Sequence, residues 1–108
     1  MKLPKTVTVA GRRVRLVLVP MDTNECYGEY LHDRKRIHVA QGLDDKTLLI
    51  TIRHEMMEAS LLLSGVGWND TYQQEAVVRC MEEIFFPAWN VFLHRITKLN
   101  RRTFNFYD

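Results

Sequence analysis

Long hydrophobic runs are missing from this 108-residue sequence, and their absence argues against a membrane-spanning protein. No apolar stretch approaches the roughly 18 residues that a membrane helix needs. The first residues, MKLPKTVTVAGRR, also lack the apolar core and the small-residue cleavage site of a secretory signal. We therefore expect no membrane partner and a cytoplasmic location, which is the host cytoplasm if the protein is viral. Association with a virion is the alternative location.

Cysteine and net charge are also scarce. Cys26 and Cys80 are far apart and lack the short spacing of a metal knuckle, so we expect two free thiols in a reducing compartment. A net charge of +2 is too small to indicate nucleic-acid binding by itself. Hydrophobic residues make up 46% and charged residues 26% of the chain, which is typical of one soluble globular domain.

The N-terminal part of the chain has the period of β-strands. Residues 6–19 contain two β-rich runs separated by Ala10-Gly11-Arg12, and residues 28–39 read as a second hairpin with a polar turn. The second arm of that hairpin, Arg36–Ala40, is expected to lie at the edge of the sheet. Strands are therefore predicted over about residues 6–40.

The C-terminal part has helical spacing instead. A first helix is predicted over about residues 45–64, capped by Asp44 or Asp45, and a second over about residues 70–96, which Pro87 should kink or split. Strands followed by helices indicate an α+β fold. We expect one domain at residues 1–98 and a C-terminal tail at residues 99–108.

The segment TIRHEMMEASLLLSG, residues 51–65, contains most of a known metal-binding pattern. In H-E-x-x-H, two histidines on one helix face bind zinc, and the intervening glutamate activates a water molecule on the metal. Here His54 and Glu55 begin the pattern, and Glu58 stands where the second histidine would be. Residues four apart share a helix face, so His54 and Glu58 can bind one ion. Glu75, in the next predicted helix, is the natural candidate for a third ligand.

Three segments occur in an order that is typical of one family: YGEYLHDRKRIHVAQGL, TLLITIRHEMMEASL and YQQEAVVRCMEE. Together they resemble small phage and bacterial metallopeptidase-like proteins of the zincin type, relatives of the ImmA/IrrE group, over about half of the chain. The resemblance implies a zincin-like fold, with a short antiparallel or mixed sheet from the hairpins packed on two or three helices. It also implies that Glu55 is the general base and that the metal ligands are His54, Glu58 and Glu75.

The glutamate at position 58 departs from the family pattern. A carboxylate can bind zinc, but a His-Glu-Glu set places two negative charges on the ion and makes it a weaker Lewis acid. Oxygen-rich ligation also favours harder ions such as Mn²⁺. We expect a metal-dependent peptidase-like protein that holds Zn²⁺ or Mn²⁺ and acts on a peptide bond. A chain that binds no metal is the alternative.

The same residues have a plainer explanation. His54 with Glu58, and Glu75 with Arg79, are also spaced as i,i+4 ion pairs on a solvated helix face. The second interpretation is therefore a catalytically inactive zincin-like protein that binds another protein or belongs to a virion.

Two further segments are candidates for partner binding. If the fold has a cleft, the strand Arg36–Ala40 would bind an extended peptide by strand addition, with Arg36 and His38 as contact residues. The aromatic segment FFPAWNVF, Phe85–Phe92, is explained first by core packing. Self-association or docking on a larger assembly is the second explanation, because a small domain has little room for four large rings.

Basic residues form three clusters, within residues 12–15, 34–36 and 95–102, and the tail adds aromatic residues. Such clusters are more often solvated faces than binding sites. A basic nucleic-acid-binding accessory domain is therefore the third interpretation, and nucleic acid is not the expected partner.

Overall fold

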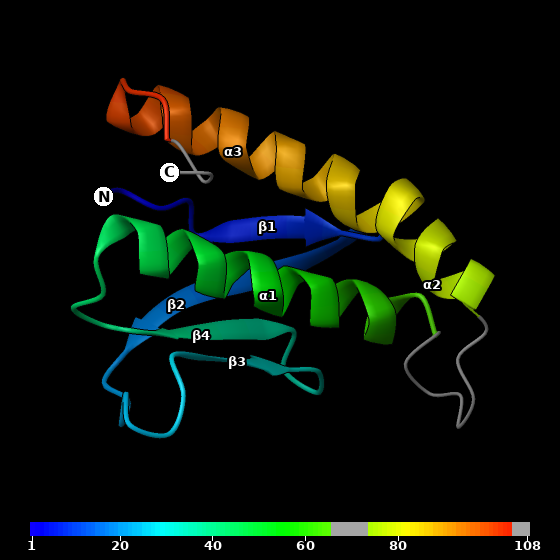
Figure 1. Cartoon of the computed structure of the whole chain (residues 1–108), viewed down its shortest axis with the longest axis horizontal. Helices are drawn as coiled ribbons and strands as arrows, with labels where there is room; N and C mark the ends of the chain where they lie inside the picture. The colour runs from blue at the N-terminus through cyan, green and yellow to red at the C-terminus, as the bar shows by residue number, and fades with distance from the viewer. Residues whose placement is uncertain (66–73, 105–108) are drawn as a thin grey trace.

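Four strands form one mixed sheet in the order β1-β2-β4-β3 (Figure 1). The computed structural model describes residues 1–65 and 74–104, and of Gln74 and Glu75 it describes the backbone only. The strands are β1 (Thr6–Val9), β2 (Arg12–Val19), β3 (Gly28–Leu31) and β4 (Arg36–Ala40). Both predicted hairpins are confirmed, since β1 pairs with β2 and β3 with β4 in antiparallel fashion. A parallel pairing of β2 with β4 joins the two hairpins.

The second half of the described chain is helical, which confirms the α+β class. The helical elements are α1 (Asp45–Leu63), α2 (Gln74–Cys80), the π-helical turn η2 (Met81–Phe85) and α3 (Phe86–Asn100). Asp44 caps α1 because its side chain accepts a hydrogen bond of 2.7 Å from the Thr47 N–H. Gly65, at a φ of +84°, follows the C-terminal end of the helix. The motif helix therefore begins and ends close to its predicted bounds.

The π-helical turn lies directly before Pro87. Proline has no N–H to donate to the carbonyl four residues earlier, so a regular helix is disturbed at this point. In η2 the N–H of Phe86 bonds to the carbonyl of Met81, five residues earlier. The predicted disturbance at Pro87 thus takes the form of one wider turn, and no loop separates α2 from α3. The start of the predicted second helix, residues 70–73, lies outside the described residues.

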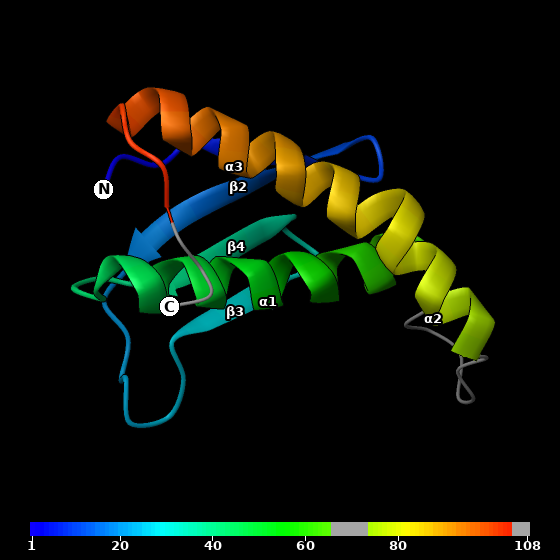
Figure 2. The same ribbon diagram turned by 45° about the horizontal axis from the view of Figure 1, so that its top comes forward.

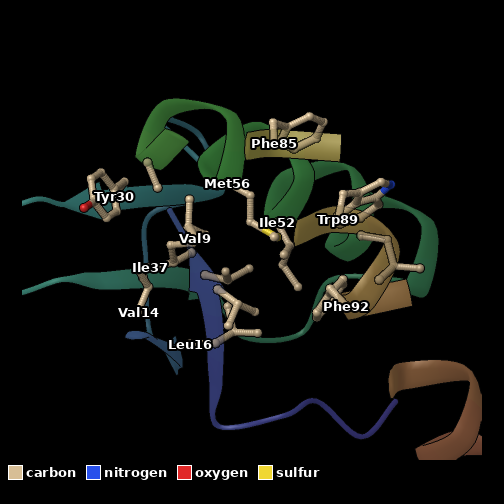
Figure 3. Close-up of a cluster of buried hydrophobic side chains, with 14 of the residues drawn as sticks. Val9, Val14, Leu16, Tyr30, Ile37, Ile52, Met56, Phe85, Trp89 and Phe92 are labelled. Atoms are coloured by element: carbon tan, nitrogen blue, oxygen red, sulfur yellow. The ribbon is translucent and has the colours of Figure 1, made fainter. Parts of the chain in front are cut away.

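The described helices that contact the sheet all pack against the same face of it. In Figures 1 and 2, α1 crosses β3 and β4 while α3 lies along β1. The core between them is apolar (Figure 3). It contains Val7, Val9, Val14, Leu16, Tyr30, Ile37 and Val39 from the sheet, Leu48, Leu49, Ile52, Met56 and Ala59 from α1, and Phe85, Trp89, Phe92 and Ile96 from the last helical elements.

Core packing accounts for most of the aromatic segment. Phe85, Trp89 and Phe92 are buried, and the Trp89 ring lies between its two neighbours at centroid distances of 6.3 and 5.2 Å. Phe86 is the exception, with half of its surface exposed. Of the four large rings in this segment, only Phe86 is exposed enough to contact a partner.

The predicted tail is partly ordered against the domain. α3 extends to Asn100, whose side chain bonds to both the N–H and the carbonyl of Lys2. Arg102 forms an ion pair with Asp45 at the start of α1, and Phe104 packs partly against the core. Residues 105–108 lie outside the described residues. No helix within the described ranges is long and apolar enough to cross a membrane.

The edge strand β3 lies unusually close to α1 at Gly28. A Cβ atom at this position would lie 2.6 Å from Thr51 Cγ2 and 3.3 Å from Glu55 Cγ. Real side chains do not approach so closely, and glycine in a strand often marks a close approach of this kind. Gly28 therefore sets the distance between β3 and the middle of α1.

Replacing Gly28 with alanine is expected to lower the free energy of unfolding by about 1–3 kcal/mol, because the new methyl group overlaps Thr51 Cγ2. Thr51→Ser is the matched second change, since it removes Cγ2 but keeps the hydroxyl that bonds to the Thr47 carbonyl. In urea unfolding followed by circular dichroism, the double variant should recover part of the loss. Equal stability of Gly28→Ala and wild type would contradict this close packing.

Candidate metal centre

Three side chains from the middle of α1 bring their donor atoms together. His54 Nε2 lies 3.3 Å from Glu58 Oε1, and the two side chains are 68% and 51% exposed. Glu55 completes the group, in which one donor atom from each residue lies within 4.8 Å of the others. The helix alone produces this arrangement, because residues three and four apart are neighbours on its surface.

Glu55 differs from its two neighbours because it is buried between α1 and β3. Only 5% of its surface is exposed, and Gly28 allows the strand to cover it. Burial is the main cause that raises the pKa of Glu55 from 4.5 to about 7. The negative charges of Glu58 and Glu29 raise it further. A buried carboxyl group whose donor atom lies within 4.8 Å of an exposed imidazole and a second carboxylate is a chemically unusual setting.

The polar contacts of Glu55 are incomplete. A hydrogen bond from the main-chain N–H of Tyr30 opposes the rise in the pKa of Glu55, and a hydrogen bond between the carboxyl groups of Glu55 and Glu58 adds to the rise. Such a carboxyl–carboxyl bond requires a proton on one partner. Oε2 of Glu55 is buried and has no hydrogen-bond partner among the described residues. A buried polar atom without a partner is uncommon and often indicates a ligand or functional role.

A cleft of about 470 Å³ opens beside this group. One wall is the stretch Cys26–Tyr30, which contains most of β3, and the other is α1. The α1 residues that line it are Ile50, Thr51, His54, Glu55 and Glu58. The three donor groups therefore lie along a space large enough for part of a ligand.

The donor set fits a divalent metal ion. One imidazole nitrogen and carboxylate oxygens are accepted ligands of Zn²⁺, and the excess of oxygen suits Mn²⁺ as well. Metal–ligand bonds of about 2.0–2.2 Å place ligand atoms roughly 3.5 Å apart, so a spread of up to 4.8 Å requires only small side-chain rotations. The unpaired oxygen of Glu55 provides a further donor.

The structure brings together three of the four residues predicted for the metal site. His54, Glu55 and Glu58 form the group, whereas the side chain of Glu75 lies outside the described residues. Glu75 belongs to the first turn of α2, which Figure 1 shows beyond the C-terminal end of α1. The donors that the structure assembles thus come from α1 alone.

The prediction that Arg36–Ala40 is an edge strand is wrong. β4 lies between β2 and β3 and pairs with both, because β3 turns outward and returns as β4 on its inner side. Arg36 and His38 alternate with the buried Ile37 and Val39, so their side chains lie on the opposite face of the sheet from α1. Neither residue lines the cleft beside His54.

The residues that take their place in the cleft are Tyr27, Gly28 and Tyr30, from or next to the true edge strand. Neither their residue types nor the hydrophobic period of the sequence predicts that these residues line the cleft. Gly28 alone could have indicated this wall of the cleft, because an isolated glycine in a strand pattern often marks a close backbone approach.

Both thiols are free, as predicted. Cys26 is exposed at the cleft, and Cys80 is buried with its sulfur 3.5 Å from the hydroxyl of Ser64. Neither belongs to the donor group found among the described residues.

No known protein family, curated protein or solved structure matches the chain.

The burial of Glu55 predicts a specific pH dependence of stability in the metal-free protein. The folded state keeps this proton up to about pH 7, whereas the unfolded chain releases it near 4.5. The stabilising contribution is thus complete below pH 4.5 and is lost as the pH rises through 7. Glu55→Gln should therefore gain up to about 3 kcal/mol over wild type between pH 4.5 and pH 8.

Urea unfolding in the presence of a chelator measures this difference. Glu82→Gln is the matched control, because it removes an exposed carboxylate on η2 that lies outside the Glu55 group. A pH-independent difference between Glu55→Gln and wild type would contradict the burial of an ionisable carboxyl group.

Proposed function

We propose that this protein is a metal-dependent peptidase of the zincin type, in which α1 carries the metal site and Glu55 acts as the general base. The observation that supports the proposal best is the convergence of His54, Glu55 and Glu58 at one wall of a cleft. The resemblance of the HEMME segment to H-E-x-x-H concerns the same three residues and connects them with a known metal-binding chemistry.

His54 and Glu58 would hold the metal ion in this proposal. They are one turn apart on the exposed side of α1 and already lie within 3.3 Å of each other. A divalent ion at this position would supply Lewis acidity to the carbonyl group of a substrate. Glu75 is proposed as the third ligand on the strength of the resemblance. The i,i+4 ion pair between His54 and Glu58 gives the same contact without a metal, so metal binding has to be measured.

Glu55 is suited to proton transfer by its position. Tyr30 holds its carboxylate through the main chain, and Gly28 fixes the strand that covers it. One carboxylate oxygen is left without a protein partner among the described residues. Glu55 can therefore take a proton from an attacking water molecule and deliver it to the leaving amine.

An extended peptide is the substrate class that we propose. β3 is an edge strand, and it borders the cleft that contains Glu55. Edge strands bind extended peptides through main-chain hydrogen bonds, and alternate side chains of the peptide then face the neighbouring helix. Tyr27 and Ile50 give the cleft an apolar, solvent-exposed rim. We therefore expect a preference for a peptide with an apolar side chain near the cleaved bond.

Metal binding is expected to respond to the residue at position 58. Glu58→His should tighten Zn²⁺ binding at least tenfold, because imidazole is a better zinc ligand than a carboxylate in this setting, while His54→Ala should abolish it. Glu75→Gln should weaken binding if Glu75 is a ligand. Isothermal titration calorimetry with zinc and manganese chloride measures all three. Glu82→His is the matched control and should leave the affinity unchanged. Absence of binding heat in both wild type and Glu58→His would contradict the site.

Catalysis is expected to depend on the carboxylate of Glu55. Glu55→Gln should retain the metal but lose hydrolysis of a fluorogenic peptide library by at least about 100-fold, because glutamine is similar in shape and has no basic oxygen. Glu82→Gln should keep wild-type activity. A metal-loaded wild type without peptidase activity would support the interpretation as an inactive binding protein. Full activity in Glu55→Gln would exclude Glu55 as the base.

A further inference from the structure

The face of the sheet that points away from α1 carries an ordered group of arginines. Arg15 on β2 and Arg36 on β4 are direct partners in the parallel register, and Arg13 lies two residues from Arg15 along β2. Strands are about 4.8 Å apart and a two-residue step is about 6.7 Å, so the three Cα atoms lie within a small triangle. The sequence places these residues in two separate clusters, and the sheet combines them.

The turn between β3 and β4 extends this group. The N–H of Arg15 donates a hydrogen bond of 2.9 Å to the carbonyl of Lys35, which holds the turn beside β2. Arg34 is exposed in this turn. We call Arg13, Arg15, Arg34 and Arg36 the basic face.

Little negative charge opposes the basic face. None of its four arginines forms an ion pair with any residue in the described part of the chain. Among the outward-pointing strand residues, Glu29 is the single acidic side chain, and the turn adds the exposed Asp33 beside Arg34. Thr8, Arg13, Arg15 and Glu29 are all exposed, so no described element covers this side of the sheet.

The composition of this face favours a phosphate backbone over a protein. Protein interfaces are enriched in aromatic residues and methionine as well as in arginine, and their centres are otherwise depleted of charge. The outward strand positions hold neither aromatic rings of Phe, Tyr or Trp nor methionine, and arginine is at their centre. Single-stranded nucleic acids are usually held by bases that stack on such rings, which this face lacks. A duplex offers rows of phosphates without any need for stacking.

We propose that the basic face binds the phosphate backbone of a nucleic-acid duplex, without sequence preference. The surface lies on the side of the sheet opposite α1, so this activity does not depend on the metal site. The bound duplex would keep the protein close to nucleic acid while the cleft beside α1 stays accessible.

Fluorescence anisotropy with labelled DNA and RNA duplexes of about 20 base pairs tests the proposal. The test variant is Arg13→Gln/Arg15→Gln/Arg36→Gln. The matched control is Lys46→Gln/Arg79→Gln/Lys98→Gln, which removes three exposed helix cations and gives the same net charge. A plot of the logarithm of the binding constant against the logarithm of the salt concentration becomes less steep by about 0.9 for each lost phosphate contact. Between about 50 and 200 mM salt, wild type should therefore lose roughly 40-fold more affinity than the test variant, which lacks three contacts. The control should behave like wild type.

A variant that is expected to gain affinity distinguishes an effect of charge from a loss of binding through misfolding. Asp33→Asn removes an exposed acidic group beside Arg34 in the turn and should tighten duplex binding severalfold. The proposal is overturned if neither duplex binds wild type at about 50 mM salt, if the two triple variants lose affinity equally, or if polyaspartate of equal charge competes as well as the duplex.

Discussion

The approach of β3 to α1 at Gly28 determines the properties of the site. Because this residue has no Cβ, the strand backbone reaches Thr51 and Glu55 and covers the Glu55 carboxyl group. Burying a carboxylate costs free energy, which the N–H of Tyr30 offsets only in part, whereas the hydrogen bond with Glu58 favours the protonated form of Glu55. The helix determines the spacing of the donor residues. The strand buries one of them, Glu55, and thereby raises its pKa. A backbone distance thus distinguishes this group from an ordinary surface ion pair.

The sheet separates two surfaces of different character. Its apolar side chains face α1 and α3 and form the core, and the donor group lies at the margin of that layer. The opposite face is open and carries arginines in register. A strand has to send alternate residues to opposite faces, so the same segments build both the core and the basic face. One compact domain can therefore carry the proposed metal site and the proposed nucleic-acid surface on separate sides of its sheet.

Local patterns in the sequence predict much of this fold. The alternation in β2, the helical spacing of α1, the cap at Asp44 and the disturbance at Pro87 follow from residue type and period. The parallel pairing of β2 with β4 does not, because it depends on where the chain returns after residues 20–27. Local patterns therefore predict the wrong edge strand and place Arg36 and His38 at the cleft, whereas the edge strand beside the cleft is β3. The sequence also indicates that His54 and Glu58 share a helix face, but the burial of Glu55 depends on a strand more than 20 residues earlier.

We propose that His54 and Glu58, with Glu55 beside them, hold a divalent metal ion. Elemental analysis of protein purified without chelators, beside a His54→Ala/Glu58→Ala variant, tests it most directly. We predict close to one equivalent of zinc or manganese per wild-type chain and almost none in the variant. Equal metal content in the two proteins, or a negligible amount in both, would contradict the account.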